Sequence, residues 1–112
     1  MVTPKSVNVM GVDIAIRIRS PKRDKELSDC YGYYDPVSCQ ITLRDDLKPA
    51  KRRETLAHEI GHAYVEHSGL GYTMMKLVQE DAAREYLEEK LIRSVIVPYV
   101  LTAYRFLQNT RL

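Results

Sequence analysis

A pentapeptide of the form H-E-x-x-H, at residues 58–62, restricts the local structure more than any other segment of the chain. Residues four positions apart lie on the same face of an α-helix, so a helix brings both imidazoles to one metal ion. Neutral imidazoles bind zinc at about 2.0–2.1 Å, and a carboxylate beside the open coordination position can accept a proton from the metal-bound water. The motif therefore predicts a helix that carries His58 and His62 as zinc ligands and Glu59 as the general base.

Two surface histidines and a solvated glutamate would give the same motif without a metal site. Gly61 argues against this alternative, because a glycine inside a helix costs about 1 kcal/mol relative to alanine. The flanking sequence supports the helix itself, since Pro49 is tolerated in a first turn and Gly69 is a stop signal. Between them, apolar residues recur at helical spacing: Leu56, Ile60 and Ala63.

A catalytic zinc ion usually has three protein ligands, so a third residue is expected from outside the motif. His67, the remaining histidine, lies five residues beyond His62 and is interpreted as a cation favoured by the helix dipole in the last turn. The better source is a glutamate of the long helical segment that follows. The candidates are Glu80, Glu85, Glu88 and Glu89. Helical spacing from the apolar positions further along favours Glu89, then Glu88, then Glu85, and a solvated helix charge is the competing interpretation for each.

The first half of the chain has the periodicity of β-strands. Apolar and polar residues alternate over residues 12–19, which predicts a half-buried strand, and residues 6–19 form either one bent strand or, as we favour, a hairpin. Residues 30–34 and 39–43 are rich in β-branched and aromatic side chains and flank an Asp-Pro turn, which predicts a second hairpin. Residues 20–29 are nearly all polar or charged and predict an exposed loop or short helix without core residues.

These elements predict a single α+β domain over residues 1–112, with a short antiparallel sheet packed on the motif helix and one or two further helices after it. A chain of 112 residues, 45% of them hydrophobic, is enough for one modest core. Pro98 is expected to break or kink the last helical segment, because proline lacks an N–H and clashes with the preceding turn. Residues 99–107 are expected to be helical again.

The charge balance argues against binding to nucleic acid or to an anionic membrane, since 17 Lys and Arg face 15 Asp and Glu and the net charge is +2. A nucleic-acid-binding regulator remains an alternative through a basic cluster that is otherwise a solvated turn: Lys48, Lys51, Arg52 and Arg53. The longest apolar run has seven residues, far short of a membrane span, and no secretory signal is visible, so a cytoplasmic location is expected. Cys30 and Cys39 are expected to be free thiols.

From about Gly32 onward the chain resembles the zincin-like metallopeptidases of the ImmA/IrrE type and the small phage- and prophage-encoded H-E-x-x-H proteins related to them. The resemblance rests on residues 32–34 with 40–43, on residues 55–62, and on the glutamate-led residues 88–95. It implies a zincin-like fold in which His58 and His62 bind zinc, Glu59 is the catalytic base and Glu89 is the downstream zinc-binding glutamate.

The implied activity is hydrolysis of a peptide bond in a protein or peptide substrate. Zinc lowers the pKa of its bound water and polarises the scissile carbonyl, and Glu59 accepts the proton and returns it to the leaving amine. In such folds the strand before the motif helix, here residues 39–43, commonly lies at a sheet edge and pairs with the substrate main chain. An oxyanion donor is also needed, and the candidates, each otherwise a packing residue, are Tyr33, Tyr34, Tyr64, Tyr72 and Tyr99.

The alternative function is a non-catalytic regulatory or protein-binding module, possibly phage-encoded, in which zinc only staples two helices. A domain this small gains considerable stability from a metal ion. A fourth protein ligand in place of water would distinguish this case from a peptidase, and Glu88 or His67 is the residue that could provide it.

Overall fold

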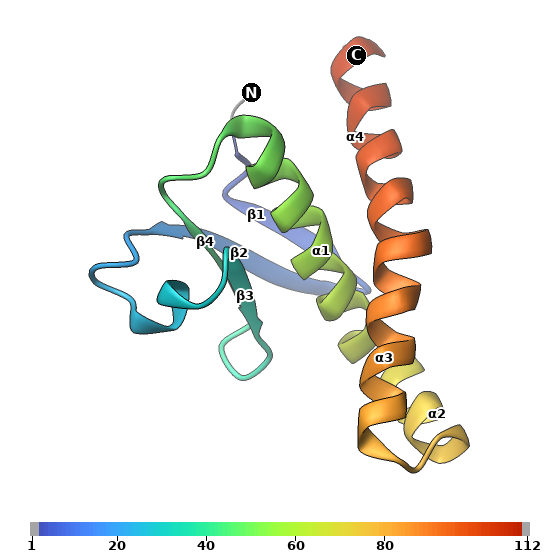
Figure 1. Ribbon diagram of the computed structural model, residues 1–112. Coiled ribbons are helices and arrows are strands. Elements are labelled where there is room, and N and C mark those ends of the chain that lie inside the picture. The colour runs from blue at the N-terminus through green and yellow to red at the C-terminus, as the bar shows by residue number, and fades with distance from the viewer. Residues whose placement is uncertain (1–2, 111–112) are drawn as a thin grey trace.

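The structure, a computed structural model, describes residues 3–110, with side chains described as far as residue 103. A four-stranded sheet lies on one side of the motif helix and a long helical segment lies on its other side (Figure 1). The strands are β1 (Ser6–Val9), β2 (Val12–Arg19), β3 (Gly32–Asp35) and β4 (Gln40–Arg44). The helices are the 3₁₀-helix η1 (Lys25–Ser28), α1 (Pro49–His67), α2 (Leu70–Leu77), α3 (Asp81–Leu91), the π-helix η2 (Ile92–Ile96) and α4 (Val97–Thr110).

The sheet is mixed, in the order β1-β2-β4-β3. Both predicted hairpins are confirmed, because β1 pairs with β2 and β3 pairs with β4 in antiparallel fashion. The predicted purely antiparallel sheet is wrong, because β2 and β4, which join the hairpins, run parallel. Residues 41–43 of β4 are all buried, which fits its interior position beside β2, and parallel pairing is typical of strands buried on both faces.

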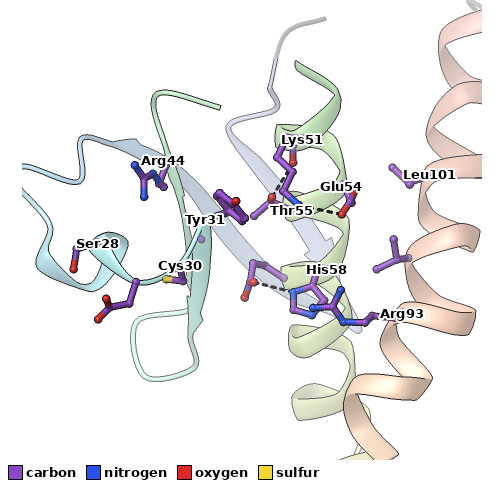
Figure 2. Close-up of a pocket in the computed structure, with 14 residues that line it drawn as sticks. Ser28, Cys30, Tyr31, Arg44, Lys51, Glu54, Thr55, His58, Arg93 and Leu101 are labelled. Atoms are coloured by element: carbon purple, nitrogen blue, oxygen red, sulfur yellow. Dashed lines mark hydrogen bonds and ion pairs between the residues drawn. The ribbon is translucent and has the colours of Figure 1, made fainter. Parts of the chain in front are cut away.

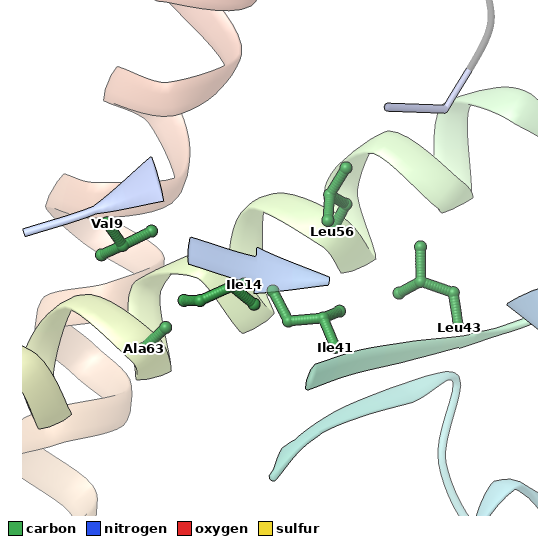
Figure 3. Close-up of a cluster of buried hydrophobic side chains, with 6 residues drawn as sticks. All are labelled: Val9, Ile14, Ile41, Leu43, Leu56 and Ala63. Carbon is green, nitrogen blue, oxygen red and sulfur yellow. The ribbon is translucent and has the colours of Figure 1, made fainter. Parts of the chain in front are cut away.

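The larger hydrophobic core lies between the sheet and α1. Ile14 of β2 and two residues of β4, Ile41 and Leu43, are completely buried. They pack together with Leu56 and Ala63 of α1 (Figure 3). Burying one such aliphatic side chain contributes about 1.5–3 kcal/mol, so this cluster holds α1, and with it the H-E-x-x-H motif, firmly against the sheet.

The segment between β2 and β3 contributes to the core, contrary to the expectation for residues 20–29. Leu27 of η1 is completely buried. Asp24 caps η1 by accepting a hydrogen bond from the Glu26 N–H, and Arg44 of β4 donates one to the Leu27 carbonyl. A single apolar residue among charged neighbours has no periodicity to reveal it, so its burial depends on the tertiary fold.

The helices after α1 differ from the predicted continuous segment. The chain is not helical at residues 78–80, and Leu77, the last residue of α2, is 79% exposed. α3, η2 and α4 then follow without interruption, so Pro98 does not break the helix. A π-turn precedes the proline, in which the Val97 N–H bonds to the carbonyl of Ile92. Within the described residues, no helix has the length and apolar character needed to cross a membrane.

Candidate metal centre

α1 presents both motif histidines on the side that faces α3. The helix begins at Pro49 as predicted and ends at His67, and Gly69 follows with a left-handed φ of 80°. The rings of His58 and His62 lie one turn apart, with centroids separated by 4.7 Å. Both side chains remain partly exposed, at 21% and 30%, so a ligand can reach them.

Glu89 of α3 meets both histidines. Its Oε2 lies 2.9 Å from Nε2 of His58 and its Oε1 lies 2.9 Å from Nε2 of His62. The three residues form a group whose potential ligand atoms all lie within 4.8 Å of one another. A tetrahedral zinc ion with bonds near 2.1 Å holds its ligands about 3.4 Å apart, a value between these distances. The donor set and its spacing therefore fit zinc.

Gly61 explains how Glu89 comes this close. A Cβ at Gly61 would lie 2.7 Å from Cγ2 of Ile92, a contact that real side chains do not make. Ile92 is completely buried and follows Glu89 by three residues in the same helical segment. The missing side chain at Gly61 thus lets α1 and the α3–η2 segment approach each other, and that approach brings Glu89 to the two histidines.

Glu59 lies beside the histidine pair and is only 6% exposed. Its Oε2 is 3.1 Å from Nδ1 of His58, the ring nitrogen that does not face Glu89. This hydrogen bond raises the pKa of His58; burial opposes the effect and Glu89 adds to it. Burial also opposes ionisation of Glu89, but the hydrogen bond and charge of His58, with the charge of His62, outweigh it and lower the pKa of Glu89. These contacts therefore favour the ionised form of the Glu89 carboxylate.

A cleft of about 670 Å³ opens at this group, between the residues that follow η1, helix α1 and the η2–α4 segment (Figure 2). His58 and Glu59 line it at the metal centre, together with Arg93 of η2. The other lining residues are Ser28, Asp29, Cys30, Tyr31, Gly32, Arg44, Lys51, Glu54, Thr55, Val97 and Leu101. The cleft is large enough for a few residues of an extended peptide.

The remaining ligand candidates lie elsewhere. Glu88 Oε1 is 3.6 Å from Nδ1 of His62, the nitrogen away from Glu89, a separation too long for a hydrogen bond. Glu80 caps α3 by accepting hydrogen bonds from the N–H groups of residues 82 and 83. Glu85 is exposed on α3 and is not part of the group of three. His67 forms a hydrogen bond with the Tyr34 hydroxyl and is not part of that group either.

None of the five tyrosines considered as oxyanion donors lines this cleft. Tyr33 donates to Asp24, and Tyr64 and Tyr99 line a separate apolar groove with Val95. Sequence reasoning missed two cleft residues, Tyr31, whose hydroxyl has no hydrogen bond to any described residue, and Arg93, whose terminal nitrogens have none either. The one sequence signal for a role of Arg93 at the site is its position one helical turn after Glu89. Cys30 and Cys39 are free thiols, and Cys30 lines the cleft.

The edge strands of the sheet are β1 and β3, and β4 is an interior strand, so the expectation that residues 39–43 lie at an edge is wrong. The interior position of β4 is in keeping with the burial of its residues 41–43. The Arg44 N–H donates to the carbonyl of Tyr31, and hydrogen-bonded positions alternate along an antiparallel pair. The backbone N–H and carbonyl of Gly32 therefore point to the free edge, beside the cleft that Gly32 lines.

A comparison of the chain with protein-family models, with curated proteins and with solved structures finds no match.

Proposed function

We propose that this protein is a zinc-dependent peptidase of the zincin type, similar to the ImmA/IrrE metallopeptidases. His58, His62 and Glu89 would hold the zinc ion, and Glu59 would be the general base. The observation that carries the proposal is the contact of both Glu89 oxygens with the Nε2 atoms of the two histidines. If the motif were only two surface histidines and a solvated glutamate, no carboxylate from another helix would be expected to contact both histidines.

Zinc held by two histidines and a carboxylate supplies a Lewis acid that polarises a carbonyl and makes water acidic at neutral pH. The chain's own groups do the rest. Glu59 lines the cleft and accepts the proton of the attacking water, then returns it to the leaving amine. Glu88 lies 3.6 Å from Nδ1 of His62 and adds negative charge on the side of the ring that faces away from Glu89.

The substrate is a peptide bound in extended form. The free edge of β3 offers the carbonyl of Gly32 next to the cleft, while the Gly32 N–H lies against the Cys30 sulfur. Main-chain pairing at a sheet edge binds peptides largely independently of their side chains. N-methylation of the peptide nitrogen that pairs with Gly32 is expected to weaken binding. Methylation of the neighbouring peptide nitrogen, which points away from the strand, is the control.

The competing function, a zinc-stapled binding module, needs a fourth protein ligand. Glu88 is the nearest further carboxylate, but it meets His62 at Nδ1 whereas Glu89 meets the same ring at Nε2. A carboxylate on the far side of the ring cannot share the metal with Nε2. Among the described residues only His58, His62 and Glu89 form a group that could hold a metal, and three protein ligands would leave a position for water, as hydrolysis needs.

The test compares metal content, metal-dependent melting and peptide cleavage of the wild type with three variants. We expect about one zinc per chain in the wild type, in Glu59→Gln and in the control His67→Ala, and loss of zinc in His62→Ala. Cleavage of a peptide library should be retained by the wild type and His67→Ala only, since removing a general base costs about 10²–10⁴-fold in rate. Zinc that survives His62→Ala would refute the site. Zinc bound without cleavage by the wild type would favour the zinc-stapled module.

A further inference from the structure

Arg93 lies beside the candidate metal centre and takes part in neither the metal group nor the core. Its Nε donates to Glu89 Oε2 at 3.2 Å, and the same oxygen lies 2.9 Å from Nε2 of His58. Figure 2 shows the side chain extending from its helix toward His58. Because one carboxylate oxygen contacts both residues, the guanidinium is held next to the atoms that would bind zinc.

The two terminal nitrogens of Arg93 are available to a ligand. They donate to none of the residues that the structure describes, and the side chain is 68% exposed and lines the cleft. The other cations of the cleft are engaged. The guanidinium of Arg44 donates hydrogen bonds to both carboxylate oxygens of Asp46 and to the backbone carbonyl of Leu27. Lys51 pairs with Glu54 at 3.3 Å and lies over the ring of Tyr31.

The backbone beneath Arg93 is fixed. Arg93 belongs to the π-helix η2, and its neighbour Ile92 is completely buried against Gly61. π-turns inside helices are frequent at functional sites, because the widened turn redirects side chains at a cost in backbone energy. The turn lies directly before Pro98, whose missing N–H and ring interrupt the regular hydrogen-bond pattern, and it sets the backbone at Arg93.

We propose that Arg93 is a catalytic residue that stabilises the negative charge on the carbonyl oxygen of the scissile peptide bond. This inference rests on the proposed peptidase function. As the water oxygen bonds to the carbonyl carbon, Glu59 takes the proton of the water and the carbonyl π electrons move onto the oxygen. Arg93 donates N–H groups to that oxygen. When the carbonyl re-forms, the C–N bond breaks and the amine leaves with the proton from Glu59.

The chemistry of arginine suits this role. The guanidinium stays charged at any working pH and presents its donors as a rigid planar fork. With Nε held by Glu89, less side-chain entropy is lost when the remaining donors meet the substrate. The role expected of a tyrosine therefore belongs to a residue that the tertiary structure places in the cleft.

The test compares Arg93→Gln and Arg93→Lys with a matched control, Arg84→Gln. Arg84 also forms an ion pair on α3, with Asp81 at 2.6 Å, but it lies outside the cleft lining. The readouts are zinc affinity by chelator competition, kcat and KM for a cleaved peptide, and binding of two tetrahedral anions to the zinc-loaded protein. The anions are inorganic phosphate and a peptide in which a phosphonate replaces the scissile amide.

We expect Arg93→Gln to lower kcat by about a hundredfold with little change in KM, and to weaken phosphonate binding by a similar factor. Zinc affinity should stay within about threefold of the wild type, Arg93→Lys should recover part of the loss, and Arg84→Gln should have no effect. A parallel loss of zinc affinity and phosphonate binding in Arg93→Gln would overturn the proposal, because Arg93 would then only position Glu89. Unchanged phosphonate and phosphate binding would also overturn it.

Failure of the peptidase function would be recognised separately. A wild type that binds zinc and cleaves no peptide refutes the proposed function, whereas phosphate binding still reports on Arg93. Weaker phosphate binding by Arg93→Gln than by Arg84→Gln would then support Arg93 as the anion-binding residue of the cleft, and equal binding would refute it.

Discussion

Replacing Gly61 by alanine should damage zinc binding more than it damages the fold. The new Cβ would lie 2.7 Å from Cγ2 of Ile92 and 3.3 Å from its Cγ1, whereas ordinary contacts begin near 3.4 Å. The two helical segments must therefore separate by about 0.7 Å (3.4 − 2.7), or Ile92 must leave its rotamer. Ile92 is completely buried, so it has little room to move.

The stability effect is a difference of two terms. Overpacking a core contact costs about 1–3 kcal/mol, and exchanging glycine for alanine inside a helix recovers about 1 kcal/mol. The net loss is about 0–2 kcal/mol. The effect on zinc is larger, because Glu89 moves with Ile92 and metal sites tolerate deviations of only about 0.2 Å. We expect zinc affinity to fall by about 10–100-fold.

The assay is chelator competition for zinc affinity, with denaturant unfolding of the metal-free and zinc-loaded forms. Gly71→Ala is the matched control, because its Cβ would meet Val65 at an ordinary 3.5 Å in helix α2. This control should keep its zinc affinity and gain up to about 1 kcal/mol in stability. Zinc affinity of Gly61→Ala equal to that of the wild type would refute the argument.

A double-mutant cycle checks that the contact with Ile92 is the cause. Ile92→Ala alone should cost about 2–5 kcal/mol, as other large-to-small core changes do. In the Gly61→Ala background the same change also removes the clash, so its cost should be smaller. Equal costs in both backgrounds would show that the two residues do not interact.

Three further predictions concern the fold around the site. Leu27→Ala should destabilise the protein by about 2–5 kcal/mol in denaturant unfolding, because the side chain is completely buried, whereas Val37→Ala, at a 93% exposed position, should change stability by less than about 0.5 kcal/mol. Glu80→Ala should cost about 1 kcal/mol through loss of the α3 cap without changing zinc affinity, and the exposed Glu85→Ala should cost less; equal costs would contradict the capping role. Burial and the Cys39 side chain raise the pKa of Tyr34 to about 12. The contribution of its neutral hydroxyl to stability is therefore complete below about pH 10 and is lost as the pH rises toward 12. Ultraviolet titration should show one late-ionising tyrosine in the wild type that is absent from Tyr34→Phe. Loss of a tyrosine that titrates near 10 instead would contradict the assignment.

Local sequence patterns were sufficient for the strands and for α1, but not for the break between α2 and α3. The alternation at residues 12–19 predicts β2, and the proline and glycine that flank the motif predict the start and end of α1. These features depend on neighbours within one or two turns, where periodicity and backbone chemistry decide the conformation. For the same reason helical spacing was enough to prefer Glu89 over Glu88, and the structure brings Glu89 to the Nε2 atoms of both histidines.

The arrangement of these elements was decided only by the tertiary structure. The parallel pairing of β2 with β4, the burial of Leu27 and the edge position of β3 depend on which combination of surfaces buries the most apolar area. No local sequence pattern specifies which arrangement of the elements buries the most apolar area. The lining of the cleft also depends on tertiary packing, because Arg93 reaches the cleft only where two helices approach each other closely at Gly61. The sequence by itself determined the H-E-x-x-H helix and the side chains on it that could bind a metal, whereas long-range packing decided which residues lie opposite these side chains.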